Sequence, residues 1–77
     1  MRPRGVIRTT IDTVGRRLTA ERGGFTWRDV ARESQIGWAV ARQCVRDMAS
    51  SGELLPVGEV REPHARRAMT LFASRDA

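Results

Sequence analysis

Apolar side chains recur early in the chain at the spacing of one helical face, at Ile7, Ile11, Val14 and Leu18. This i, i+4, i+7, i+11 pattern predicts an amphipathic helix that ends at Gly23 and Gly24. Two signals compete for its start, because Thr9 and Asp12 could form a capping box, whereas Pro3 suits a first helical turn. They leave the start of the helix open by about one turn.

A short extended segment and a second helix are predicted after the glycine pair. Phe25 is a lone large apolar residue there, which indicates a segment that places one aromatic ring in the core. Thr26 and Asp29 follow at the spacing of a capping box, with threonine at the N-cap and a carboxylate at N3. The helix that they open is short and runs to about Glu33.

A third helix is predicted from Trp38, after Ile36 and Gly37 interrupt the pattern. It ends at the Ser-Ser-Gly run of residues 50–52. Its apolar stripe is narrow and consists of Ala41, Cys44, Val45 and Met48. Cys44 is expected to be a small buried apolar residue.

The second and third predicted helices have the offsets of a helix-turn-helix. Such a motif needs a small residue where its helices cross, and Ala31 has that position. The positions that the motif keeps apolar or small are occupied by Val30, Ile36, Ala41 and Cys44. Ser34 and Gln35 depart from the leucine and glycine that many such turns carry, as is common in winged helices.

The last third of the chain predicts a hairpin. Two extended runs cover residues 54–57 and 68–72, and a polar loop of residues 58–67 joins them. The order is therefore helix, short strand, helix, helix, strand, loop, strand. This order predicts an α+β fold, a winged helix with a three-helix core and a C-terminal β-hairpin wing.

Length and composition exclude several classes of function. A chain of 77 residues makes one small domain whose core is too small for a deep substrate pocket, so we expect no enzyme. One cysteine and one histidine exclude an internal disulfide and a zinc site, and without lysine no phosphate-binding loop can form, so we expect no cofactor. The longest apolar stretch, residues 37–41, cannot span a membrane, which predicts a soluble cytoplasmic protein.

The charge balance favours a polyanionic partner. Fourteen basic residues, all arginine, against nine acidic ones give a net charge of +5. Codon bias in a GC-rich genome could explain the lack of lysine, but not where the charge lies. Arg2, Arg4 and Arg8 carry no carboxylate among them, which predicts a basic N-terminal arm over residues 1–8 ahead of a domain over residues 9–77.

The exposed face of the third helix is the candidate reader of DNA bases. It consists of Trp38, Ala39, Arg42, Gln43 and Arg46. Arginine can donate two hydrogen bonds to guanine, and glutamine can bond adenine in the same bidentate way. The alternative for this face is exposure to solvent without a partner. For Trp38 and Trp27 the alternative is that each packs against neighbouring helices or a dimer partner.

The predicted hairpin loop has the charge of a DNA-binding wing. Its candidate contacts to DNA are Arg61, His64, Arg66 and Arg67, which would lie along the phosphates or enter the minor groove. Glu53 and Glu59 make the base of the hairpin acidic and should face away from DNA. The alternative is a merely solvated loop.

Two segments resemble the small winged-helix DNA-binding proteins of bacteria and their phages. Residues 45–58 carry an apolar residue, spacers, Gly-Glu-Leu and a valine-glycine pair, and residues 67–73 form the end of an arginine-bearing wing with an aromatic strand. The resemblance covers residues 25–73. It implies a recognition role for Arg42, Gln43 and Arg46 and a wing role for Arg66 and Arg67, and it implies no small-molecule effector, because members that sense ligands usually carry a further domain.

Together these features predict a sequence-specific regulator of transcription, encoded by a phage or mobile element, that binds double-stranded DNA. Paired half-sites would follow if the chain forms a homodimer. Two other functions stay open. One is a low-specificity DNA-binding factor in replication or DNA architecture, and the other is a winged helix that binds a protein partner, with a tryptophan as its anchor.

Overall fold

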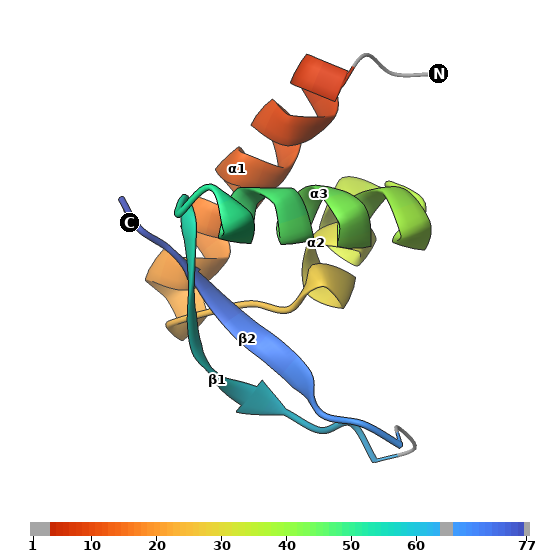
Figure 1. Cartoon of the computed structure of the whole chain (residues 1–77), viewed down its shortest axis with the longest axis vertical. Coiled ribbons are helices and arrows are strands. Elements are labelled where there is room, and N and C mark those ends of the chain that lie inside the picture. Colours follow the sequence, from red (N-terminus) through yellow and green to blue (C-terminus); the bar gives the residue numbers. More distant parts are fainter. Residues whose placement is uncertain (1–3, 64–65, 77) are drawn as a thin grey trace.

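The computed structural model describes residues 4–63 and 66–76. Three helices come first, α1 (Arg4–Arg22), α2 (Trp27–Ser34) and α3 (Trp38–Ser50), followed by an antiparallel hairpin of β1 (Leu54–Val60) and β2 (Met69–Ser74). In Figure 1, α1 crosses behind α3, and the hairpin tip lies at the opposite end of the long axis from the start of α1. This α+β layout is that of a winged helix and confirms the predicted fold class.

The first helix begins earlier than the Thr9 signal indicates. The hydroxyl groups of Thr9 and Thr10 donate to the carbonyl oxygens of Gly5 and Val6, each at 2.8 Å, which is how threonine bonds inside a helix. Thr9 is therefore not an N-cap, and the capping box expected there is wrong. Residues 4–8, which the sequence assigns to a basic arm, form the first turns of α1.

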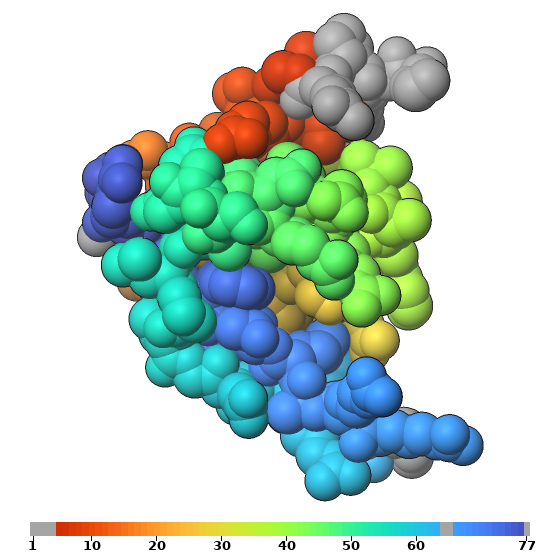
Figure 2. Space-filling view, in the orientation of Figure 1, coloured from red at the N-terminus to blue at the C-terminus, as the bar shows by residue number. Residues whose placement is uncertain are grey.

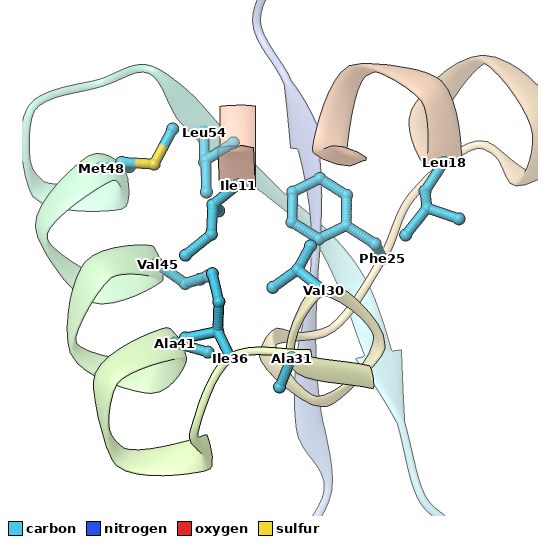
Figure 3. Close-up of a cluster of buried hydrophobic side chains, with 10 residues drawn as sticks. All are labelled: Ile11, Leu18, Phe25, Val30, Ala31, Ile36, Ala41, Val45, Met48 and Leu54. Carbon is cyan, nitrogen blue, oxygen red and sulfur yellow. The ribbon is translucent and has the colours of Figure 1, made fainter. Parts of the chain in front are cut away.

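The core is built around Phe25, which lies between α1 and the sheet. Its backbone N–H and C=O each bond Phe72 of β2 at 2.7 Å, which confirms the predicted extended segment. Gly15 leaves room for the ring, because a Cβ atom at that position would lie 2.9 Å from its Cζ atom. The buried apolar cluster in Figure 3 comprises Ile11, Leu18, Phe25, Val30, Ala31, Ile36, Ala41, Val45, Met48 and Leu54.

α2 is fixed by local backbone geometry and hydrogen bonds at both of its ends. Thr26 and Asp29 form the predicted capping box, with Asp29 N to Thr26 Oγ1 at 3.2 Å and Thr26 N to Asp29 Oδ2 at 3.0 Å. At the other end Gln35 is left-handed, with φ of 54°, at the position where many such turns carry glycine. Ala31 is buried there, as the predicted helix crossing requires.

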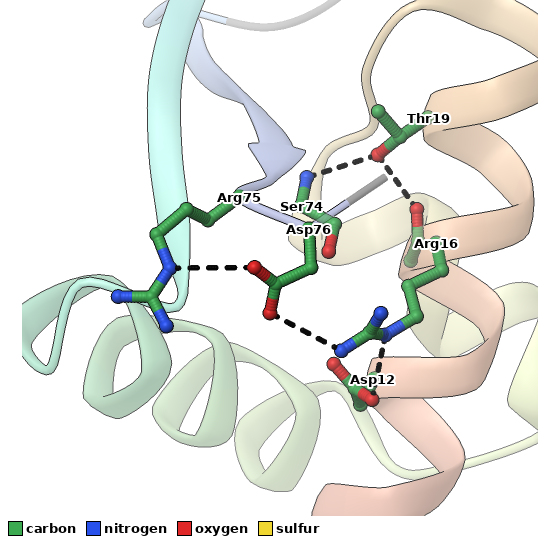
Figure 4. A network of polar contacts seen from close by, with 7 residues as sticks. Asp12, Arg16, Thr19, Ser74, Arg75 and Asp76 are labelled. Carbon is green, nitrogen blue, oxygen red and sulfur yellow. Dashed lines mark hydrogen bonds and ion pairs between the residues drawn. The ribbon is translucent and has the colours of Figure 1, made fainter.

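The hairpin is longer than the sequence predicts and is fixed at its base. β1 continues to Val60, and the ladder is interrupted by an irregularity between Pro56 and Gly58. Ser74 N donates to Thr19 Oγ1 at 3.0 Å, and Arg16 pairs with Asp12 and Asp76 at 3.0 and 3.4 Å (Figure 4). The contacts of Ser74 with Thr19 and of Asp76 with Arg16 attach the end of β2 and the segment after it to α1, so the hairpin leaves the core in a defined direction.

No helix in the described ranges is both long and apolar enough to cross a membrane. α1 is the longest of them, but arginines recur along it, and Ile7, Ile11, Val14 and Leu18 recur at the spacing of one helical face. That face is turned inward, since Ile11 and Leu18 are fully buried. These four apolar residues of α1 are therefore used in the core of the domain.

Candidate nucleic-acid interface

The exposed face of α3 is as the sequence predicts. Trp38, Ala39, Arg42, Gln43 and Arg46 are all exposed, whereas Ala41, Val45 and Met48 are buried. The expectation that Cys44 is buried is wrong, because this residue lies at the edge of the apolar stripe and is only half-buried. Its Sγ atom lies 3.9 Å from Met48 Sδ, and burial raises the pKa of the thiol, so the group is neutral at ordinary pH.

One predicted base reader is held by a neighbour that sequence reasoning missed. The amide Nε2 of Gln43 donates to Oδ1 of Asp47 at 2.9 Å. Asp47 is exposed and puts a carboxylate on the same face of α3. The i, i+4 spacing of the two residues was a signal for this bond. Gln43 can therefore reach a base only by changing its rotamer or by bringing Asp47 with it.

A groove of about 650 Å³ lies between α3 and the hairpin. Figure 2 shows it as a hollow below α3, with β2 along one side and the start of α2 at its back. Four arginines line it, namely Arg28, Arg42, Arg46 and Arg67, and none of the described residues that line it is acidic. Apolar residues form the rest, among them Val45, Ala49, Pro56 and Phe72. The structure thus brings two predicted recognition residues and one predicted wing residue to one cationic surface.

The two tryptophans at the starts of α2 and α3 pack against each other. The rings of Trp27 and Trp38 meet edge to face, with centroids 5.7 Å apart and an interplanar angle of 74°. The guanidinium carbon of Arg28 lies 5.5 Å from the centroid of Trp27 and 4.8 Å from that of Trp38, and that of Arg42 lies 5.9 Å from Trp27. Trp27 is half-buried, whereas 60% of Trp38 remains exposed.

Arg28 is the residue of this surface that sequence reasoning missed. Its Nη1 atom lies 2.5 Å from Oε2 of Glu62, near the hairpin tip, and its Nε atom is buried with no partner in the described part of the chain. Arg28 and Glu62 are 34 residues apart, so no local pattern could pair them. The contact ties the hairpin to the start of α2.

The remaining predicted wing residues lie in or beside the loop after β1. Arg61, Arg66 and Arg67 are exposed, and His64 lies outside the described residues. Glu59 is exposed on β1 beside them, and its orientation away from DNA stays a prediction. Three arginines of the predicted wing thus lie at the end of the hairpin.

The described part of the predicted N-terminal arm, residues 4–8, belongs to α1 and is not among the residues that line the groove. Arg2 lies outside the described residues, and Arg4 opens α1 at the far end of the long axis from the hairpin tip (Figure 1). Arg8 pairs with Glu53 at the start of the hairpin, where Ser51 Oγ also donates to Glu53 Oε2 at 2.6 Å. The charge of Arg8 therefore serves to join α1 to the base of the hairpin.

The comparisons with known proteins add no relative. No protein-family model matches the chain, and no curated protein matches it either. Within residues 4–63 and 66–76 no group of three or more His, Cys, Asp or Glu side chains is placed to hold a metal ion. The features of the molecule that bear on its function are therefore the fold and the arginine-lined groove.

Proposed function

We propose that the chain is a sequence-specific DNA-binding regulator of transcription. α3 enters the major groove, and the hairpin lies on the neighbouring backbone or minor groove. The observation that carries the proposal is the groove between these two elements, which has four arginines and no acidic side chain among its described lining residues. A guanidinium group matches a phosphate in both charge and hydrogen-bond geometry.

Base reading in this proposal comes from the part of α3 beside the groove. Arg42 and Arg46 lie one turn apart on its exposed face, and each can donate two hydrogen bonds to guanine. The Gln43 amide is shared with Asp47, so its contact with adenine is weaker than that of a free glutamine. Guanine-rich half-sites are therefore the expected target.

Two measurements test this function. An electrophoretic mobility shift on random duplex at low salt should show binding that weakens as salt is raised, since phosphate contacts release counterions. Selection of bound duplexes from a random pool should then yield a motif, and symmetry in that motif would report a dimer. No shift at low salt would contradict DNA binding, and a shift without a motif would favour the low-specificity factor.

A protein-binding role is the second candidate, and the exposed apolar residues of α3 favour it. Trp38 is 60% exposed and Val40 is 46% exposed, and tryptophan is common at the centre of protein interfaces. Under this reading Trp38→Ala would abolish capture of the partner while leaving any duplex binding by Arg42 and Arg46 intact. Loss of duplex binding in Trp38→Ala, with the fold retained, would instead assign the tryptophan to the DNA surface.

A further inference from the structure

We propose that Glu62 occupies, in the free protein, the position on Arg28 that a backbone phosphate of DNA takes in the complex. The inference rests on the proposed DNA-binding function and assigns a phosphodiester site to the groove. Arg28 is its central ligand, and the carboxylate of Glu62 is displaced when the phosphate binds.

Arg28 is built into the fold as a partly desolvated cation. Only 26% of its side chain is exposed, and its guanidinium group lies against the rings of Trp27 and Trp38. Its Nη1 atom donates to Glu62, but its Nε atom is buried without a partner in the described ranges. Glu62 therefore satisfies part of the hydrogen-bonding capacity of Arg28. A cation held away from water in this way binds an anion more strongly than an exposed one does.

Glu62 is the carboxylate placed to compete with a phosphate. Its side chain is 37% exposed, and it lies just beyond the end of β1, so it can leave Arg28 without disturbing the ladder. Carboxylate and phosphate oxygens accept hydrogen bonds from guanidinium in the same planar arrangement. Exchange of one for the other therefore needs no rearrangement of Arg28.

The other arginines of the groove show where the DNA strand would run. Arg42, Arg46 and Arg67 make no ion pair within the described part of the chain, so Arg28 is the one groove arginine that an acidic side chain neutralises there. A strand passing between α3 and the hairpin would meet all four guanidinium groups. Removing the charge of Glu62 should thus strengthen the site for a backbone phosphate.

The test compares Glu62→Gln with Glu59→Gln, which removes the same charge from the same arm of the hairpin. Glu59 is exposed and makes no ion pair among the described residues, so it measures the general effect of one negative charge fewer. We expect Glu62→Gln to bind random duplex about two- to fivefold more tightly than Glu59→Gln, the factor set by loss of one surface ion pair. The gain should be equal on a selected site, because phosphate contacts carry no sequence information.

A second comparison assigns the gain to Arg28. In an Arg28→Met background, which keeps an unbranched side chain beside the tryptophan rings, Glu62→Gln and Glu59→Gln should bind equally. In an Arg32→Met background, with an exposed arginine one turn along α2 replaced instead, the difference between them should persist. Thermal unfolding of each variant checks that the fold is retained.

Each other outcome has one meaning. Equal affinities of Glu62→Gln and Glu59→Gln in the wild-type background would overturn the inference and leave the DNA-binding function intact. Weaker binding by Glu62→Gln would also overturn the inference, because the ion pair of Glu62 with Arg28 would then be needed to position the hairpin for DNA. A gain restricted to the selected site would place Glu62 near a base rather than a phosphate. Absence of any duplex binding by the wild-type protein would overturn the function and the inference together.

Discussion

Gly15 shows how one missing side chain shapes the core. It lies in the middle of α1, where glycine is unfavourable compared with alanine, yet its position lets the Phe25 ring approach the helix backbone. The buried ring in turn holds the extended segment against β2. The glycine is therefore required by packing rather than by backbone conformation.

Gly15→Ala should therefore destabilise the protein, although glycine-to-alanine changes inside helices usually stabilise. The new Cβ atom would lie 2.9 Å from Phe25 Cζ in a fully buried ring, and such overpacking costs about 1–3 kcal/mol. Gly5→Ala, on the same helix with no atom within 4 Å of its Cβ position, is the control and should be neutral or stabilising. Urea denaturation measures both, and a stabilised Gly15→Ala would contradict the packing argument.

Single arginines should also separate base reading from phosphate binding. Arg42→Ala should reduce the preference for particular base pairs by about 1–3 kcal/mol, because a bidentate contact to guanine is lost. Arg66→Ala should weaken all sequences alike and reduce the salt slope by about 1. Competition between selected and random duplexes measures the difference, and an unchanged preference in Arg42→Ala would show that this arginine does not read bases.

At the residue scale, the features that the sequence predicts correctly are those that depend on local interactions. The capping box of Thr26 and Asp29 spans three residues, and the face of α3 follows from helical spacing, so both are readable from the chain. Thr9 has the same local signal, but the capping box predicted there is wrong. No local feature distinguishes a capping threonine from a threonine inside a helix that starts earlier. The contact of Arg28 with Glu62 depends on how the hairpin folds back over α2, and no pattern along the chain encodes it.

At the scale of elements, α2 depends most on its ends. It has only eight residues, and an isolated helix of that length is unstable in water. The capping box at its start and the left-handed Gln35 at its end satisfy backbone groups that would otherwise lack partners. α2 also presents Trp27 and Arg28 to the groove, so its stability and the shape of the proposed DNA surface are connected.

Thr26→Ala should lower the free energy of unfolding by about 1–2 kcal/mol, the usual effect of losing an N-cap hydroxyl. Thr26 is buried, so water cannot replace the lost bond to Asp29 N. Thr26→Ser keeps the hydroxyl and should lose much less. Chemical denaturation of the two variants provides the comparison, and equal losses would show that the methyl group rather than the cap is what matters.

At the scale of the whole molecule, the arginines of α1 and those of the groove differ in their ion pairs. Arg8, Arg16 and Arg17 of α1 pair with carboxylates that lie elsewhere in the fold, on the hairpin base, the segment after β2 and α2. Surface pairs of this kind contribute little stability each. They do neutralise arginines of α1, whereas Arg42, Arg46 and Arg67 of the groove make no ion pair within the described part of the chain.

This distribution predicts the salt dependence of duplex binding. If Arg28 and Arg67 of the groove and Arg66 beside it each neutralise one phosphate, log affinity should fall against log salt with a slope of about −3. Between about 50 and 200 mM salt the affinity should then decrease about 40-fold. Titrations at several salt concentrations give the slope, and a value near −1 would show that the groove does not follow the DNA backbone.

The cluster of Trp27, Trp38 and Arg28 has an optical consequence. The chain contains two tryptophans and no tyrosine, and both indole rings lie against the same guanidinium group. The ultraviolet fluorescence of the whole protein therefore comes from one place, at the junction of α2, α3 and the hairpin tip. The wavelength and intensity of this emission can therefore report, in the unlabelled protein, a ligand that enters the groove or a movement of Glu62.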